Sequence, residues 1–223
     1  MTALLVLTTF LTFAALDYLL FRRKSRPIEV ALAATAEPVL AAEPIFVAGY
    51  QLPEELAYHP GHTWARVTGP DTAVVGVDDF ASKLVGRAQR LRLPAPGEWV
   101  RQGARSVHVD ADGRGTDLVS PLEGEVVEVN PDLKKEPALA TWDPYGRGWL
   151  YRVRAPGLGT GLRNLLRGRL ARTWTEDSSQ QLNLRLMALS GSVLQDGGTP
   201  DPDFARHLDA GEWKRLTDHF FLA

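Results

Sequence analysis

The 223-residue sequence contains no cysteine. Without a thiol, disulfide bonds, thiolate metal sites and cysteine nucleophiles are all excluded. The chain also lacks a surplus of positive charge, since 25 lysine and arginine residues stand against 27 aspartate and glutamate residues, for a net charge of −2. Because nucleic-acid binding depends on clustered positive charge, we expect no nucleic-acid partner. The 44% of hydrophobic and 23% of charged residues are typical of a globular protein.

Residue sets that would carry catalysis or bind a dinucleotide are also missing. No Ser-His-Asp, paired-carboxylate or phosphate-loop arrangement is evident, so we predict that the chain is not an enzyme. The glycines that lie between a predicted strand and a predicted helix have Leu162 where a dinucleotide-binding loop would have its last glycine. We interpret them as a flexible joint; they are Gly157, Gly159 and Gly161.

Two groups of residues resemble fragments of metal sites. His59 and His62 are separated by proline and glycine and have no evident third ligand. Asp110, Asp112 and Asp117 have the rhythm of a calcium loop but lack its terminal glutamate. We therefore expect no metal, and interpret the aspartates as part of a solvated turn.

One long apolar run predicts a membrane anchor. Residues 3–21 are nearly continuously apolar, which is enough for about one crossing of a bilayer, and a basic cluster follows at 22–26. A cleaved signal peptide would carry its positive charges before the apolar run, although the alanines at 31–36 resemble a cleavage site. The positive-inside rule places everything from Arg22 onward in the cytoplasm, so we predict a single-pass protein of the cell membrane.

The rest of the chain divides into three predicted regions. After the anchor and its basic flank at 1–26, residues 27–50 are rich in alanine, proline and glutamate and predict a linker. Residues 51–156 predict a mainly β domain, with valines on alternate positions and Gly/Pro turns between strands. Residues 157–223 predict a helical extension.

The extension is predicted to contain three helices. The first has leucines at helical spacing over Leu162–Leu170 with arginines between them, and it would cover the sheet or lie on anionic lipid or an acidic partner. Thr173–Glu176 has the pattern of a capping box and predicts the start of the second helix. The third is predicted over Ala210–Phe221. Whether these helices pack on the β domain or on another subunit stays open.

A hairpin is predicted over Ser106–Ser120, because Val107 and Val109 alternate with polar residues and Asp112-Gly113 favours a tight turn. Together with its flanks this segment resembles the H protein of the glycine cleavage system, a lipoyl carrier with a barrel-sandwich hybrid fold. The resemblance covers about residues 56–155. The motifs that carry it are His62-Thr63-Trp64, Gly76-Val77, Phe80-Ala81, Gly97, Gly103, Ser120-Pro121, the run Gly124–Asn130 and the run Asp143–Leu150.

The resemblance implies a lipoylated lysine at the hairpin tip, and this chain has none there. Counted back from Ser120-Pro121, the lysine position falls on Gly113, beside Arg114. Arginine cannot replace the lysine because its guanidinium stays protonated and is not a nucleophile. We therefore expect no lipoate cofactor. Asp112, Gly113 and Arg114 form a candidate docking tip instead, although exposed polar tips are usually only solvated.

The sequence thus predicts a mainly β barrel-sandwich hybrid with C-terminal α-helices and an N-terminal transmembrane helix. Its predicted role is that of a non-catalytic adaptor or accessory subunit of a membrane-associated complex. One alternative is a working lipoyl carrier of the glycine cleavage system. Another is a membrane-fusion-type transport adaptor, which would place the domain outside the cytoplasm and usually has a long helical hairpin at the tip.

Overall fold

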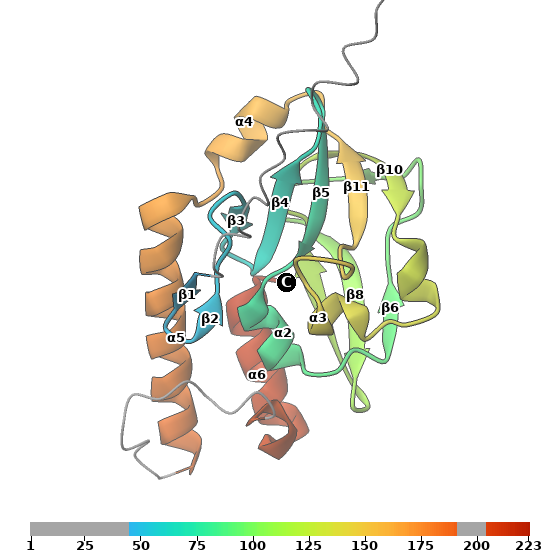
Figure 1. The fold of residues 1–223 in the computed structure, drawn as a ribbon. Helices are drawn as coiled ribbons and strands as arrows, with labels where there is room; N and C mark the ends of the chain where they lie inside the picture. Colours follow the sequence, from blue (N-terminus) through green and yellow to red (C-terminus); the bar gives the residue numbers. More distant parts are fainter. Residues whose placement is uncertain (1–44, 191–203) are drawn as a thin grey trace, which may run out of the picture. The chain divides into compact units, whose positions relative to one another are not determined.

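Residues 45–190 and 204–223 are described by the computed structural model (Figure 1). They belong to one compact unit, Pro44–Ala223. The predicted membrane segment 3–21 lies outside the described residues, and among the helices that are described none is long and apolar enough to cross a bilayer. The transmembrane anchor therefore stays a prediction.

The larger sheet has six antiparallel strands in the order β3-β4-β5-β11-β10-β7. Its central strand β5 is buried along most of its length because alternate side chains enter two hydrophobic clusters. Val75 and Val77 join the main core, whereas Val74 joins a second cluster with Trp64 and Tyr58. The strands span Ala57–His59 (β3), Thr63–Val67 (β4), Thr72–Val77 (β5), Trp99–Val100 (β7), Gly124–Val129 (β10) and Tyr151–Arg154 (β11).

The smaller sheet contains the predicted hairpin. Its order is β6-β8-β9, with bounds Arg90–Arg92, Arg105–Ala111 and Arg114–Val119. The valines of β8 face the main core while its polar residues point outward, as their alternation predicts. Asp112 and Gly113 both have positive φ, 49° and 73°, which is the backbone of a two-residue type I′ turn. The mainly β prediction and the predicted hairpin are confirmed.

Short helices and one two-stranded ribbon cover the sheets. The strands β1 (Phe46–Val47) and β2 (Tyr50–Gln51) pair with each other. Helix α2 (Asp79–Val85) begins at Asp78, whose carboxylate accepts from the Ala81 amide at 2.8 Å. A 3₁₀ turn, η2 (Pro131–Lys134), and a one-turn helix, α3 (Leu139–Trp142), follow β10.

The first two predicted C-terminal helices were placed wrongly. Helix α4 spans Leu158–Arg163, so the glycines interpreted as a flexible joint are its N-cap and part of its first turns. The chain then leaves the helix because Leu166 exchanges two backbone hydrogen bonds with Tyr58, at 2.8 and 2.9 Å. Helix α5 runs unbroken over Gly168–Ser190, so Thr173–Glu176 lies inside it and caps nothing.

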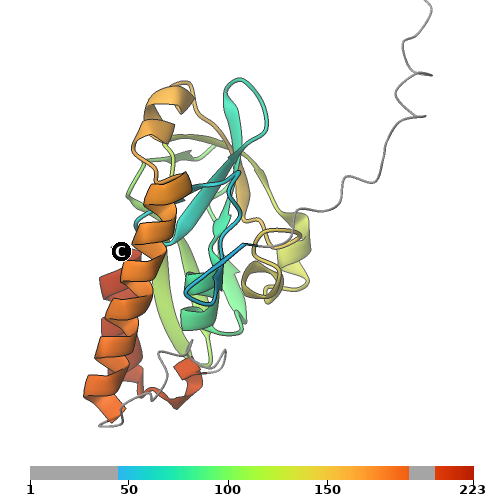
Figure 2. The same cartoon turned by 60° about the vertical axis from the view of Figure 1, so that its left-hand side comes forward.

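Helix α6 begins and ends where the sequence predicts, at Ala210 and Phe221. It follows a 3₁₀ turn, η3 (Phe204–His207), and a capping box that joins Asp209 and Glu212. Its apolar side chains pack on the β domain, which answers the question that the sequence left open. Helix α5 lies against α6, because Arg185 and Gln181 contact the His219 ring at 3.1 and 3.3 Å (Figure 2).

Candidate functional site

The hairpin tip is exposed but carries no amine. Asp112 and Gly113 are exposed and form the turn between β8 and β9, the lower end of the hairpin in Figure 1. A Cβ atom added to Gly113 would meet nothing within 4 Å, so a side chain at this position would extend into open space. Position 113 is therefore accessible, but its glycine has no side chain to which a group could be attached.

Arg114, the third residue of the predicted docking tip, points towards the C-terminal segment. Its Nη1 donates to the carbonyls of Ala205 at 3.0 Å and Leu208 at 3.3 Å. Its guanidinium also lies over the Trp213 ring, 4.8 Å from the ring centre. Nη1 therefore binds the chain's own C-terminal segment and not an external carboxylate or phosphate, while the buried Nε has no hydrogen-bond partner among the described residues.

The turn itself is held from two sides. One carboxylate oxygen of Asp112 accepts from Gln89 at 3.1 Å, and the other lies 3.7 Å from Arg206 of η3. A hollow of about 520 Å³ lies beside the turn. It is lined by Asp112, Gly113, Arg114, Arg206, Leu208 and Ala210.

Trp213 joins the hairpin to helix α2. Its ring is 1% exposed, and its indole N–H donates to the carbonyl of Leu84 at 2.9 Å. Because Arg114 of β9 lies on the same ring, one side chain of α6 contacts both the hairpin and α2. The C-terminal helix thus covers the inner side of the hairpin close to its tip.

The residues considered for metal binding do not gather into a metal site. Asp110 and Asp117 both contact His108, at 3.3 and 2.5 Å, while Asp112 turns to Gln89 and Arg206. In the parts of the chain that are described, no group of three or more His, Asp or Glu side chains is arranged to hold a metal ion.

The two histidines at 59 and 62 serve the fold. His62 is 1% exposed, its Nδ1 lies 2.8 Å from a carboxylate oxygen of Asp78, and its ring stacks on Phe80 at 4.0 Å. Nδ1 of His59 accepts from the Gly61 amide at 2.9 Å. Burial, with a smaller effect of the neighbouring His62, lowers the pKa of His59 to about 4.

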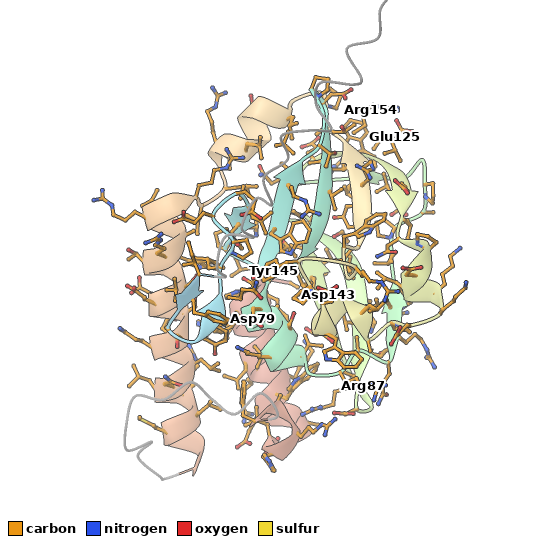
Figure 3. All side chains as sticks on the ribbon, in the orientation of Figure 1. Asp79, Arg87, Glu125, Asp143, Tyr145 and Arg154 are labelled. Carbon is orange, nitrogen blue, oxygen red and sulfur yellow. The ribbon has the colours of Figure 1, made fainter. Side chains whose placement is uncertain are left out.

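The motif Asp143–Leu150 connects distant parts of the domain. The Tyr145 hydroxyl accepts from the Asp79 amide at 2.9 Å and donates to the Gln51 carbonyl at 2.8 Å (Figure 3). Burial, and secondly the charge of Asp78, raise the pKa of Tyr145 well above its ordinary value, so the phenol stays protonated. Tyr145 therefore fixes the start of α2 to β2, a role that the sequence did not reveal.

A second hollow, which sequence reasoning missed, lies between α2 and α3. It measures about 400 Å³. Trp142, at the end of α3, lines this hollow and is 76% exposed. The sequence contained an indication of this hollow. Trp142 directly precedes the motif Asp143–Leu150, and two cationic residues, Lys83 and Arg87, are four positions apart. The lining residues are Asp79, Ser82, Lys83, Gly86, Arg87, Ala138, Thr141 and Trp142.

Comparison with known proteins supports the family that the motifs suggested. The family model described as glycine cleavage H-protein matches residues 56–177, so the match extends past β11 into α5. The chain is 40% identical over 104 residues to the glycine cleavage system H protein of Rubrobacter xylanophilus, which covers 47% of this chain and 82% of that protein. It is 36% identical over 104 residues to the H protein of Marinobacter nauticus, with 47% and 80% covered.

A solved structure is similar as well. The crystal structure of a glycine cleavage system H protein from Mycobacterium marinum shares 33% sequence identity with this chain. The similarity covers 47% of this chain and 87% of that one, with a TM-score of 0.45. On the family match and the sequence identities, the chain belongs to the glycine cleavage H-protein family.

Proposed function

We propose that this chain is a membrane-anchored, non-catalytic adaptor that keeps the H-protein fold but carries no lipoyl group. One observation carries the proposal: the hairpin tip holds Gly113 in a left-handed turn, next to an Arg114 that binds the chain's own C-terminal segment. The fold of a carrier is thus retained without the group that would be carried.

The chemistry of attachment supports this proposal. A lipoyl group is joined to a lysine through an amide bond, which requires a neutral amine as the nucleophile. Glycine offers no side chain, and the guanidinium of Arg114 stays protonated. No lysine lies within the hairpin Arg105–Val119. Nζ of Lys83, on α2, already donates to Asp79 and to the Gly49 carbonyl, both at 2.9 Å.

The predicted anchor supports an adaptor rather than a shuttle. A carrier that moves between soluble enzymes gains nothing from attachment to a bilayer, whereas a subunit of a membrane-associated complex gains a high local concentration there. The basic cluster at 22–26 favours a domain on the cytoplasmic side. A reporter fused after Ala223 tests this orientation, because activity only on the external side would favour a transport adaptor.

The exposed tip supports a protein partner. Asp112 is fixed by Gln89 and Arg206, so the turn needs little ordering when it enters a partner's cleft. Its exposed atoms belong to Asp112 and Gly113, and we propose that these two residues make the contact.

The experiment that tests the adaptor is capture of the full-length chain from native membranes in mild detergent, with mass spectrometry of what co-purifies. The tip variant is Asp112→Asn with Gly113→Asn, since asparagine tolerates left-handed backbone and preserves the turn. Gly97→Asn is the matched control, because Gly97 also has positive φ, 87°, and open space around it.

We expect a stoichiometric membrane complex with the unaltered chain and with Gly97→Asn, and its release by the tip variant. Recovery of glycine-cleavage enzymes together with a lipoylated chain would revive the carrier. If no protein co-purifies with the unaltered chain, the adaptor proposal fails.

A further inference from the structure

We propose that the hollow between α2 and α3, here called the α2–α3 pocket, docks an acidic segment of a protein partner. Trp142 would cover the apolar part of that segment, while Arg87 would pair with one of its carboxylates. The pocket is separate from the hairpin tip, and this inference requires only the folded domain. It therefore stands or falls independently of the missing lipoyl group.

The exposure of Trp142 is the first observation. At 76% it is the most exposed large hydrophobic side chain in the described parts of the chain. Tryptophan is enriched among residues that dominate binding energies, because its large ring buries much area when a partner covers it. A tryptophan held in water on the edge of a 400 Å³ hollow thus offers an anchor for a partner.

The pocket wall is held in place by the core, so it is preorganised. In α3, Leu139 and Ala140 are buried in the main cluster. Thr141 Oγ1 accepts from the Ala88 amide at 3.3 Å, which ties α3 to the end of α2. The Trp142 amide donates to the Ala138 carbonyl at 2.8 Å. Binding here would cost little ordering of the backbone, which favours affinity.

The charges define the chemistry of the partner. Arg87 follows the end of α2, is exposed, and has no hydrogen-bond or ion-pair partner within residues 45–190 and 204–223 (Figure 3). Lys83 is already engaged within the domain: its Nζ pairs with Asp79 and donates to the Gly49 carbonyl, both at 2.9 Å, and lies 4.8 Å from the centre of the Tyr50 ring. A Cβ atom added to Gly86, which has φ of 78°, would meet nothing within 4 Å.

An acidic protein segment fits these features better than other ligands do. One unpaired guanidinium beside an indole suits a carboxylate next to an apolar residue, since arginine binds carboxylates with two parallel hydrogen bonds. A nucleic acid would need a larger basic surface than this chain of net charge −2 offers. Binding should weaken with salt, because the charged groups are exposed.

The test uses the full-length chain in mild detergent and a fluorophore-labelled hexapeptide of sequence Glu-Leu-Glu-Glu-Phe-Glu, followed by fluorescence anisotropy. A peptide with lysine in place of each glutamate is the charge control. We expect the acidic peptide to bind at least tenfold more tightly than the basic one. Trp142→Ala should weaken acidic-peptide binding at least tenfold and Arg87→Gln about fivefold, as expected for an anchor and a charge pair.

Two matched variants separate docking from general effects. Trp99→Ala removes another exposed tryptophan, which lines a different hollow, and Arg90→Gln removes another exposed arginine. Both should bind the acidic peptide as the unaltered chain does. Arg87→Glu should reverse the preference in favour of the basic peptide. The proposal is overturned if the unaltered chain does not bind the acidic peptide, or if Trp142→Ala behaves like Trp99→Ala.

Discussion

Two tryptophans next to helix α2 have opposite environments. Trp213 is 1% exposed and donates to the Leu84 carbonyl of α2, whereas Trp142 is 76% exposed and lines the α2–α3 pocket. Each has an arginine as neighbour. Arg114 lies over Trp213, and Arg87 lines the same pocket as Trp142. The same pair of residue types thus holds the C-terminal helix in one place and faces solvent in the other.

The difference shows how the chain's own C-terminal segment changes its surface. On the hairpin side, α6 and η3 cover the aromatic ring and bind the arginine. On the other side, no described segment covers Trp142. Residue types that favour binding in one environment therefore stabilise the fold in another, and only their surroundings distinguish the two roles.

The largest expected effect is the loss of stability when Trp213 is replaced. Trp213→Ala should lower the free energy of unfolding by about 3–5 kcal/mol, because a buried aromatic ring is lost and a cavity remains. Trp142→Ala should change it by less than about 0.5 kcal/mol, because its ring is already in water. Urea unfolding followed by circular dichroism measures both changes. Equal losses of unfolding free energy would show that the two tryptophans do not differ in their contribution to the fold.

Arg114→Ala should cost less, about 1–2 kcal/mol, because its hydrogen bonds to Ala205 and Leu208 and its contact with Trp213 are lost. Arg105→Ala is the control, since its ion pair with Asp117 at 3.6 Å is exposed and should contribute less than about 0.5 kcal/mol. Thermal unfolding of the two variants compares them. If they are equally stable, Arg114 does not hold α6.

Gly113→Lys tests whether α6 would prevent lipoylation of the tip, or whether the missing amine is the only obstacle. The substitution should cost about 1 kcal/mol, because a side chain is placed in left-handed backbone. Since that side chain would extend into open space, we expect lipoyl ligase to attach one lipoyl group to the variant. Intact mass measures this, with a lipoylated H protein as a positive control. An unmodified variant beside a modified control would show that the covered hairpin excludes the ligase.

The smallest expected effect is a loss of stability at low pH, which depends on His59. His59 has a folded pKa of about 4, below its ordinary 6.5, so the unfolded chain binds the proton more readily. The contribution of His59 to stability is therefore fully present above about pH 6.5 and is lost as pH falls towards 4. The loss between pH 7 and pH 5 should stay under about 1 kcal/mol, because the ring is partly exposed.

Urea unfolding of the unaltered chain and of His59→Asn, which can still accept from the Gly61 amide, measures this loss at the two pH values. A pH dependence that persists in His59→Asn would assign it to another group. Binding of the acidic hexapeptide at the α2–α3 pocket should not follow this titration, because no histidine lines that pocket.

The sequence predicted the elements that depend on local patterns. The hairpin followed from alternating valines and Asp112-Gly113, and α6 followed from the spacing of its apolar residues, which include Trp213 and Phe220. The break between α4 and α5 was not predictable from local pattern, because it depends on a backbone pairing of Leu166 with Tyr58, more than a hundred positions away.

The candidate sites were predicted only in part. The motifs located the tip and the missing lysine, but not the contact of Arg114 with Ala205 and Leu208, which lie about ninety residues along the chain. The exposure of Trp142 was hidden as well, because most tryptophans are largely buried and the neighbouring motif suggests a packed loop.

The most direct test of the central claim is the intact mass of the full-length chain purified from the cells that produce it. We predict one species at the unmodified mass, because Gly113 offers no amine at the hairpin tip. A species heavier by one lipoyl group, with the modification mapped to any lysine of this chain, would show that it is a carrier after all.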